Sequence, residues 1–480
     1  MRLSMIGRIE RVAAAGALAL LAACSPVGPN YVKPSAPISP GFKELVQWKE
    51  ADGWKPAQPA DNVLRESWWE LYGNAELSAL EARVESGNFT VAIAEARDRQ
   101  ARAALAAARA AGFPTASVGA SETASRRSVN TAGGASSRGE TTYDYLLPVS
   151  LSWEPDLWGR VRRSVEAGQA DLQASRADLQ STLLGIRALL AQSWFQLRAL
   201  DGQKRLLDET LAAYRKSVEL TRNRYVGGVA SKADVLQAET QLRTVEAQAI
   251  DIGVARAQLE HAIAILVGKS PSELSLPVTP LAGVPPPVPV GVPSVLLERR
   301  SDIAGAERRM ASANARIGVA ESAFYPNVTL SVSGGLEAAG FAKWLSWPSR
   351  FWALGPAISE VVFDGGLRKA QSAQARAGYD AAVASYRQTV LTGFQEVEDS
   401  LATLRILEEE ARVQEEAIQS ARQSVELATN QYKAGTVSYL NVVVAQTAAL
   451  SNERTALDIL SRRMTASVQL IKAVGGGWKP

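Results

Sequence analysis

Two very long runs of heptad-spaced apolar residues limit what this chain can fold into. Residues 160–223 form a stretch of 64 residues in which leucine, valine and tyrosine recur at seven-residue intervals. The second half of the chain repeats this pattern from Val383 to Tyr432. Sustained heptads predict left-handed coiled-coil packing. A helix of this length spans about 95 Å at about 1.5 Å per residue, whereas helices of globular proteins average about 11–12 residues.

The end of each long run carries a repeated motif. Residues 217–231 read SVELTRNRYVGGVAS and residues 424–438 read SVELATNQYKAGTVS, so that eight of fifteen positions match. Each half also contains an Ala-rich helical segment, two strand-like runs and a second helix, and a proline-rich stretch separates the halves. A period of about 210 residues indicates an internal duplication of helical hairpins rather than a solenoid of short repeats.

The first residues resemble an export signal. A basic segment precedes VAAAGALALLAA, an apolar run that is too short to span a membrane as a helix. The run ends in LAAC, where Cys24, the only cysteine of the chain, completes a sequence similar to a bacterial lipobox. We therefore expect acylation of Cys24. The resemblance to bacterial lipoproteins implies that Ser25, which follows the cysteine, directs sorting to the outer membrane. The alternative is an ordinary export signal with an accidental cysteine.

The predicted domain organisation follows the duplication. A lipoprotein signal peptide is followed by a proline-rich extension, a first repeat, a proline-rich linker and a second repeat. Their expected bounds are 1–23, 24–64, 65–270, 271–294 and 295–480.

Four segments alternate in the manner of β-strands. They lie at about 113–125, 141–153, 325–337 and 351–363. In the second, Tyr143, Val149 and Trp153 share one face with other apolar residues, and serines occupy the opposite face. Each run is long enough to cross a bilayer as a tilted strand, and aromatic residues cluster near the ends.

Four strands are too few to close a barrel, for which about eight is the practical minimum. Open strand edges are not tolerated in lipid. If these strands cross a membrane, several chains must therefore share one barrel, most simply through cyclic symmetry. The alternative is a soluble four-stranded sheet that packs on the helices.

Composition argues against catalysis and nucleic-acid binding. The net charge is +3, and the chain has one histidine and one cysteine among 480 residues. No metal-ligand set or phosphate-binding loop occurs at a recognised spacing. We expect no enzyme activity and no cofactor, apart from the covalent lipid on Cys24.

The order of several motifs resembles one family. These motifs are VGPNY, SWWELYGNAELSALEARVESGN, WEPDLWGRVR, LERRSDIAGAERRMASANARIGVAESAFYPNVTL, FDGGLRKA and AVGGGW. Together they are similar to the TolC-type outer-membrane efflux channels, and most of all to the OprM/NodT-like lipoprotein branch. The resemblance covers nearly all of the chain after the export signal.

The resemblance implies a mainly α fold with a transmembrane β part. Long coiled-coil hairpins would form an α-barrel, continued by a 12-stranded β-barrel to which each chain of a homotrimer gives four strands. Such a protein is the passive exit duct of a tripartite efflux pump and contributes to multidrug resistance. It would be lipid-anchored in the outer membrane and extend into the periplasm. Its partners would be a periplasmic adaptor (membrane fusion) protein and an inner-membrane pump, usually of the resistance-nodulation-division type.

In the family, the hairpins turn at the periplasmic tip, where the tunnel narrows. The matching turn positions are Tyr225, Gly228, Ser231, Tyr432, Gly435 and Ser438. The matching gate positions are Asp234, Leu440, Asn441 and Val444. The family often carries aspartate at the last two of these positions, and neither is acidic here.

The resemblance also places a basic residue opposite Asp234, but this chain has Val437 there. A salt bridge that locks the tip is therefore absent, and Arg224 or Lys433 could substitute for it. Our hypothesis is that three Leu440 side chains close the aperture as an apolar ring. Two alternatives remain: Leu440 only packs between helices, or the whole chain is a non-channel periplasmic coiled-coil lipoprotein that acts as a scaffold or adaptor.

Overall fold

The computed structural model describes residues 26–35, 41–45, 67–130, 139–286 and 299–476. The expected signal peptide and Cys24 lie outside these ranges. The chain divides into two compact units, and each combines parts of both halves of the sequence. One consists of residues 1–35, 98–174 and 306–386, and the other of residues 36–97, 175–305 and 387–480.

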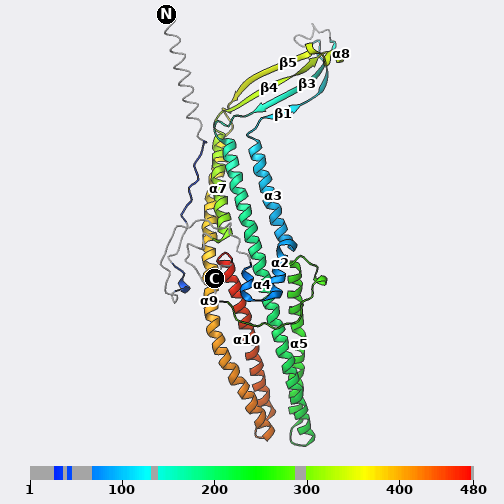
Figure 1. Cartoon of the computed structure of the whole chain (residues 1–480), viewed down its shortest axis with the longest axis vertical. Helices are drawn as coiled ribbons and strands as arrows, with labels where there is room; N and C mark the ends of the chain where they lie inside the picture. Colours follow the sequence, from blue (N-terminus) through cyan, green and yellow to red (C-terminus); the bar gives the residue numbers. More distant parts are fainter. Residues whose placement is uncertain (1–25, 36–40, 46–66, 131–138, 287–298, 477–480) are drawn as a thin grey trace. The chain divides into compact units, whose positions relative to one another are not determined.

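The first unit contains one antiparallel sheet (Figure 1). Its strands are β1 (Thr115–Val118), β2 (Ser121–Arg126), β3 (Thr141–Trp153), β4 (Asn327–Ala338) and β5 (Arg350–Ser359). They are ordered β1-β3-β4-β5, and β2 also pairs with β3. Helices α3 (Phe89–Ala110) and α7 (Ser301–Ser322) lead into the sheet, and α4 (Arg160–Val226) and α9 (Leu367–Ala434) leave it.

The strand expected at 113–125 is split into β1 and β2, and Pro148 explains the break. Both segments keep one register on β3, in which Gly119 lies opposite Pro148. The amide of Gly119 donates to the Pro148 carbonyl at 3.0 Å. Proline has no N–H to return this bond, so the ladder is interrupted at that pair.

The strand expected at 351–363 is shorter than the sequence suggested. β5 ends at Ser359, and Asp364 then caps the start of α9, because its carboxylate accepts the amides of Gly366 and Arg368 at 2.9 and 3.1 Å. Asp156 does the same for the start of α4. The two motifs WEPDLWGRVR and FDGGLRKA therefore have one structural role, which is to begin a long helix.

The residues of VGPNY pack against this unit as an extended strap. The amide of Val27 donates to the carbonyl of Trp158 at 3.0 Å. The side chain of Arg163 is 3% exposed and donates to the carbonyls of Val27 and Gly28 and to the side chain of Asn30. A buried guanidinium that satisfies several acceptors holds this segment in one place.

The second unit is built from two helical hairpins. The first joins α4 to α5 (Lys232–Leu266), and the second joins α9 to α10 (Tyr439–Ala473). Buried side chains from both hairpins pack together in two clusters. One consists of Leu207, Leu211, Tyr214, Val245, Ala249 and Leu450, and the other of Val218, Ala238, Tyr432, Tyr439 and Val442.

Short elements complete the second unit. They are η1 (Lys43–Leu45), η2 (Trp68–Tyr72), α2 (Ala75–Gly87) and η3 (Pro271–Glu273). None of the helices in the described ranges combines the length and the apolar character that a bilayer crossing requires.

Candidate functional site

The two hairpin tips have the same turn. In the first, the amides of Gly228 and Val229 donate to the carbonyls of Tyr225 and Arg224, both at 2.9 Å. In the second, the amides of Gly435 and Thr436 donate to Tyr432 and Gln431 in the same pattern. This is the Schellman arrangement at a helix C-terminus. Gly228 and Gly435 have φ values of 72° and 77°, which glycine adopts without strain.

The residues that follow the two turns differ. Ser231 caps α5, and its hydroxyl accepts the amide of Asp234 while the Asp234 carboxylate accepts the amide of Ser231, each at 3.1 Å. This is a reciprocal capping box, so Asp234 stabilises the start of its own helix. At the matching positions of the second hairpin, the Ser438 side chain forms no capping hydrogen bond with the start of α10. The backbone amide of Asn441 donates to the Ser438 carbonyl instead.

Arg224 joins the two tips. Its guanidinium donates to the carbonyl of Lys433 at 2.8 Å and lies over the ring of Tyr432, with Cζ 4.9 Å from the centroid. The acceptor belongs to the last turn of α9, where free carbonyls favour a cation. The guanidinium of Arg224 thus makes both of these contacts, whereas Lys433 contributes only its backbone carbonyl to the link.

Aromatic packing lies next to the contact between Arg224 and the second hairpin. Tyr432 and Tyr439 meet edge to face with centroids 5.2 Å apart, and both rings are buried. Burial raises the pKa of Tyr439 to about 12, although a hydrogen bond to Ser217 acts in the opposite direction. The Tyr439 side chain is therefore neutral at physiological pH. Tyr432, the second copy of the repeated tyrosine, is buried in one cluster with Val218 and Ala238 of the first hairpin, whereas the first copy, Tyr225, is exposed.

The predicted gate residues of α10 lie on its exposed face. Leu440 and Val444 are 51% and 61% exposed, and Asn441 is also exposed. Positions 440, 444, 447 and 451 are spaced so that they share one side of the helix. Within one chain no core encloses Leu440, so the structure leaves this apolar side chain available at the tip.

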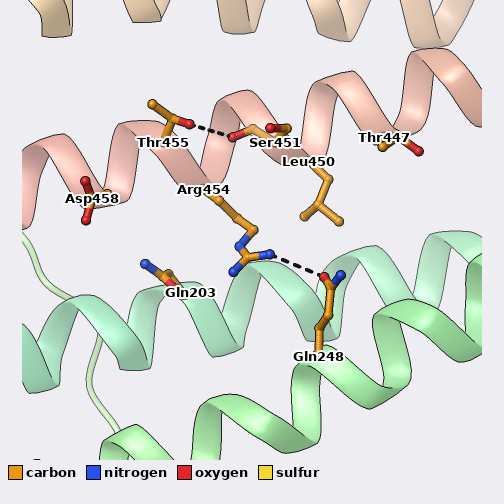
Figure 2. Close-up of a pocket in the computed structure, with 8 residues that line it drawn as sticks. All are labelled: Gln203, Gln248, Thr447, Leu450, Ser451, Arg454, Thr455 and Asp458. Carbon is orange, nitrogen blue, oxygen red and sulfur yellow. Dashed lines mark hydrogen bonds between the residues drawn. The ribbon is translucent and has the colours of Figure 1, made fainter.

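Above the tips, a polar groove of about 540 Å³ lies between the hairpins (Figure 2). It is lined by Gln203, Gln248, Thr447, Leu450, Ser451, Arg454, Thr455 and Asp458. Two hydrogen bonds cross from α5 to α10: Gln241 to Thr447 at 2.9 Å, and Arg454 to Gln248 at 3.3 Å.

Sequence reasoning missed this pair of polar links. Both partners advance by seven residues between the first link and the second, so the bonds follow the heptad repeat. The sequence did contain a signal for these bonds, because polar residues recur at one heptad position of α5 (Gln241 and Gln248) and of α10 (Thr447 and Arg454). Heptad spacing alone, however, does not say which helix of one hairpin packs against which helix of the other.

The sheet has one apolar face and one face of small and polar residues. Ala116, Leu151, Val332 and Leu354 form a continuous cross-strand row on the first face, and Ser117, Ser150, Ser333 and Ala353 form a row on the other. The apolar row is exposed, with Leu354 62% accessible. An exposed apolar face of this extent marks a surface that meets lipid or protein.

Nothing in the described ranges suggests a catalytic or metal centre. No group of three or more His, Cys, Asp or Glu side chains there could hold a metal ion.

Comparisons with known proteins agree with these features. A family model described as outer membrane efflux protein matches residues 80–269 and 292–476. A probable efflux pump outer membrane protein of Pseudomonas putida, TtgC, is 31% identical over 461 residues, which cover 96% of this chain and 94% of the relative.

Two solved structures are also similar. The outer-membrane channel OprN superposes with a TM-score of 0.84 at 29% identity and covers 95% of this chain and 100% of its own. The outer membrane protein VceC of Vibrio cholerae gives a TM-score of 0.79 at 29% identity, with 88% and 100% covered. This chain therefore belongs to the outer membrane efflux protein family.

Proposed function

We propose that three copies of this chain assemble into the exit duct of a tripartite efflux pump, which conducts small molecules across the outer membrane. Family membership already makes the chain an outer-membrane efflux component rather than an enzyme. The observation that carries the assembly is the sheet. It exposes an apolar face, and β5 at one edge and the β1/β2 segments at the other each pair on one side only. Sharing one barrel among three chains pairs those edges and presents the apolar face to lipid.

Membrane extraction tests this assembly. We expect the protein to stay in the outer-membrane fraction after alkaline carbonate treatment and to run as a trimer in mild detergent. Release of a monomer by carbonate would instead support the rival function, a periplasmic coiled-coil scaffold or adaptor.

The partners in this proposal meet the hairpin tips. A periplasmic adaptor would dock there and connect the duct to an inner-membrane pump, usually of the resistance-nodulation-division type. A photo-crosslinker at exposed Thr436 should capture the adaptor in cells that express the cognate pump. The same probe on the sheet, at Ser333, should not capture it.

The gate in this proposal is an apolar ring of three Leu440 side chains, backed by Asn441 and Val444 and held shut by Arg224. The exposure of Leu440 and the two tip contacts of Arg224 support it. Leu440→Ala should raise the conductance of the resting channel in a planar bilayer by about two-fold or more, because smaller side chains widen and wet the constriction. Arg224→Ala should also favour the open state, since it frees one tip from the other.

An exposed leucine of α9, Leu427, provides the matched control. Leu427→Ala should leave the conductance unchanged. If Leu440→Ala behaves in the same way, Leu440 only packs between helices and the ring does not exist.

We further propose that Cys24 carries a covalent lipid, palmitate among its acyl chains. The strap supports this assignment, because Val27 is bonded to Trp158 and Trp158 stacks on Tyr325 at 4.9 Å near the base of the sheet. From Pro26 two residues reach back about 7 Å at most, so a lipid on Cys24 would begin near this aromatic pair. Cys24→Ser should abolish labelling by radioactive palmitate yet preserve the trimer. Labelling at the wild-type level in that variant would exclude Cys24 as the site.

A further inference from the structure

The loop between β4 and β5 folds into two short helical turns rich in aromatic residues. They are α8 (Phe341–Trp344) and η4 (Trp347–Ser349). Hydrogen bonds from Ser346 and Ser349 to the carbonyl of Lys343 close the loop at 2.6 and 2.7 Å. The loop is therefore an ordered structure at the end of the sheet opposite the long helices (Figure 1).

This loop packs on the apolar face of the sheet. Phe341 and Trp344 contact the ring of Tyr145, with centroids 5.7 and 5.8 Å apart. Tyr145 belongs to the alternating set of β3 that includes Leu151 in the apolar row. The loop thus extends the face that meets lipid in our proposal, and it does not fold over the face of serines.

Most of the apolar surface of the loop is nevertheless exposed. Phe341, Leu345 and Trp347 are 69%, 70% and 77% exposed, and Trp352 of β5 beside them is 80% exposed. The loop between β2 and β3, in contrast, contains mainly small, polar and basic residues. Only one of the two loops at this end has the composition of a segment that enters the interface of a bilayer.

Lys343 and Arg350 are the cations at this loop. Arg350 is opposite Leu336 in the ladder, which places it on the same face, and its guanidinium stacks on Trp347 at 4.4 Å. Among the described residues neither Arg350 nor Lys343 has an ion-pair partner. Glu122 is on the same face of the sheet, but its carboxylate accepts a hydrogen bond from the hydroxyl of Tyr145. Two unpaired cations next to exposed aromatic rings favour an anionic group at the boundary between apolar chains and water.

We propose that Lys343, Arg350 and the aromatic side chains of this loop bind the phosphate-bearing headgroup of a membrane lipid. The guanidinium and the ammonium engage the phosphates, and Phe341, Leu345 and Trp347 contact the adjoining acyl chains. Stacking on Trp347 holds Arg350 in position without neutralising it. The inference rests on the proposed membrane placement of the sheet.

The experiment uses the purified full-length protein in mild detergent. It is titrated with diphosphoryl lipid A, with the same glycolipid stripped of its phosphates, and with inorganic phosphate, and native mass spectrometry counts the ligands bound per chain. We expect preferential binding of the diphosphoryl form. Lys343→Gln or Arg350→Gln should each weaken this binding about five-fold, and the double variant about thirty-fold.

Arg127→Gln is the matched control, because Arg127 is an exposed cation in the other loop at the same end of the sheet. It should change the affinity by less than two-fold. Equal binding of the phosphorylated and stripped glycolipids would overturn the proposal, as would an unchanged affinity in the double variant. Inorganic phosphate that competes at the same concentration as the lipid would instead reveal a small-anion site.

A vesicle experiment separates this inference from the function on which it rests. If the wild-type protein inserts into phosphatidylcholine vesicles and resists carbonate extraction but shows no preference for the phosphorylated glycolipid, only the lipid-binding proposal is wrong. If the protein does not insert into vesicles, the proposed function as a membrane duct is wrong.

Discussion

Asp201→Ala is expected to destabilise the folded chain by about 3–5 kcal/mol, because it removes the buried carboxylate that Arg198 and Arg256 share. The Asp201 side chain is fully buried, and Arg198 is 1% exposed. The carboxylate accepts from Arg198 and Arg256 at 2.7 Å each and from the amide of Thr279 at 3.0 Å. Without it, Arg198 keeps the carboxylate of Glu76 and Arg256 keeps that of Glu260. Each guanidinium, however, loses one charged acceptor, and the amide of Thr279 loses its acceptor as well.

The same network fixes the segment that follows α5 and η3. Arg198 donates to the carbonyl of Pro277, and Arg256 donates to that of Leu276 at 2.8 Å. Loss of Asp201 should therefore also loosen residues 276–281 from α4 and α5. We expect faster proteolysis within this segment in the variant.

The measurement is the temperature at which the assembled protein dissociates in mild detergent, together with the rate of limited proteolysis. Asp208→Ala is the control, since Asp208 lies on the same helix and pairs with Lys204 at the exposed surface. An exposed pair of this kind contributes about 0.3–0.5 kcal/mol. Equal effects of the two substitutions would show that the buried network does not stabilise the fold.

Much of the fold could be predicted from the sequence because its signals are local and repeated. The heptads indicated a helix of 64 residues in the first half and a second long helix that repeats its pattern, and α4 and α9 have 67 and 68 residues. The predicted family, the mainly helical fold with a sheet, the efflux function and the outer-membrane location are confirmed by the comparisons. These predictions needed only residues close together in the chain or whole motifs in order.

The contacts that join distant segments could not be predicted in this way. The sequence indicated that Arg224 or Lys433 could hold the tip, but the two are 209 positions apart and no periodicity pairs the guanidinium of Arg224 with the Lys433 carbonyl. Glu81 is a second example. It lies among the apolar positions of α2 and is completely buried, and burial raises its pKa to about 9 although Arg187 acts in the opposite direction. A sequence pattern assigns such a glutamate to the solvated face of a helix.

Pro148 is an example of a signal that was present but not used. A proline within an alternating run removes one hydrogen bond from the ladder with the neighbouring strand, since it lacks the N–H of a strand residue. What the sequence could not supply was the register, which decides that Gly119 is the residue that loses its partner.

Gly335→Ala is expected to disrupt the centre of the sheet and to prevent assembly. Gly335 is in β4, opposite Pro148 of β3 and Phe351 of β5. A Cβ atom at this position would lie 2.1 Å from the carbonyl oxygen of Leu147 and 3.0 Å from the Cα of Pro148. Both neighbours are backbone atoms, so the clash is relieved only if β3 and β4 separate.

Overpacking of this kind costs about 1–3 kcal/mol in a well-packed interior. Here it also breaks hydrogen bonds between the two central strands, and unpaired backbone groups are especially costly if the sheet is in lipid. We expect Gly335→Ala to lower the yield of assembled protein in the outer membrane several-fold more than any other glycine-to-alanine change in the sheet. The readout is the fraction of assembled and dissociated protein in mild detergent after membrane extraction.

Gly355→Ala in the adjacent strand is the matched control. Its Cβ would meet no heavy atom within 4 Å, and its φ is not positive. Replacing an unstrained glycine by alanine changes stability by about 0.4–1 kcal/mol in the favourable direction, because the unfolded chain loses freedom. The two alanine variants should therefore move the assembled fraction in opposite directions. Normal assembly of Gly335→Ala would mean that β3 and β4 do not approach as closely as the register that pairs Gly335 with Pro148 requires.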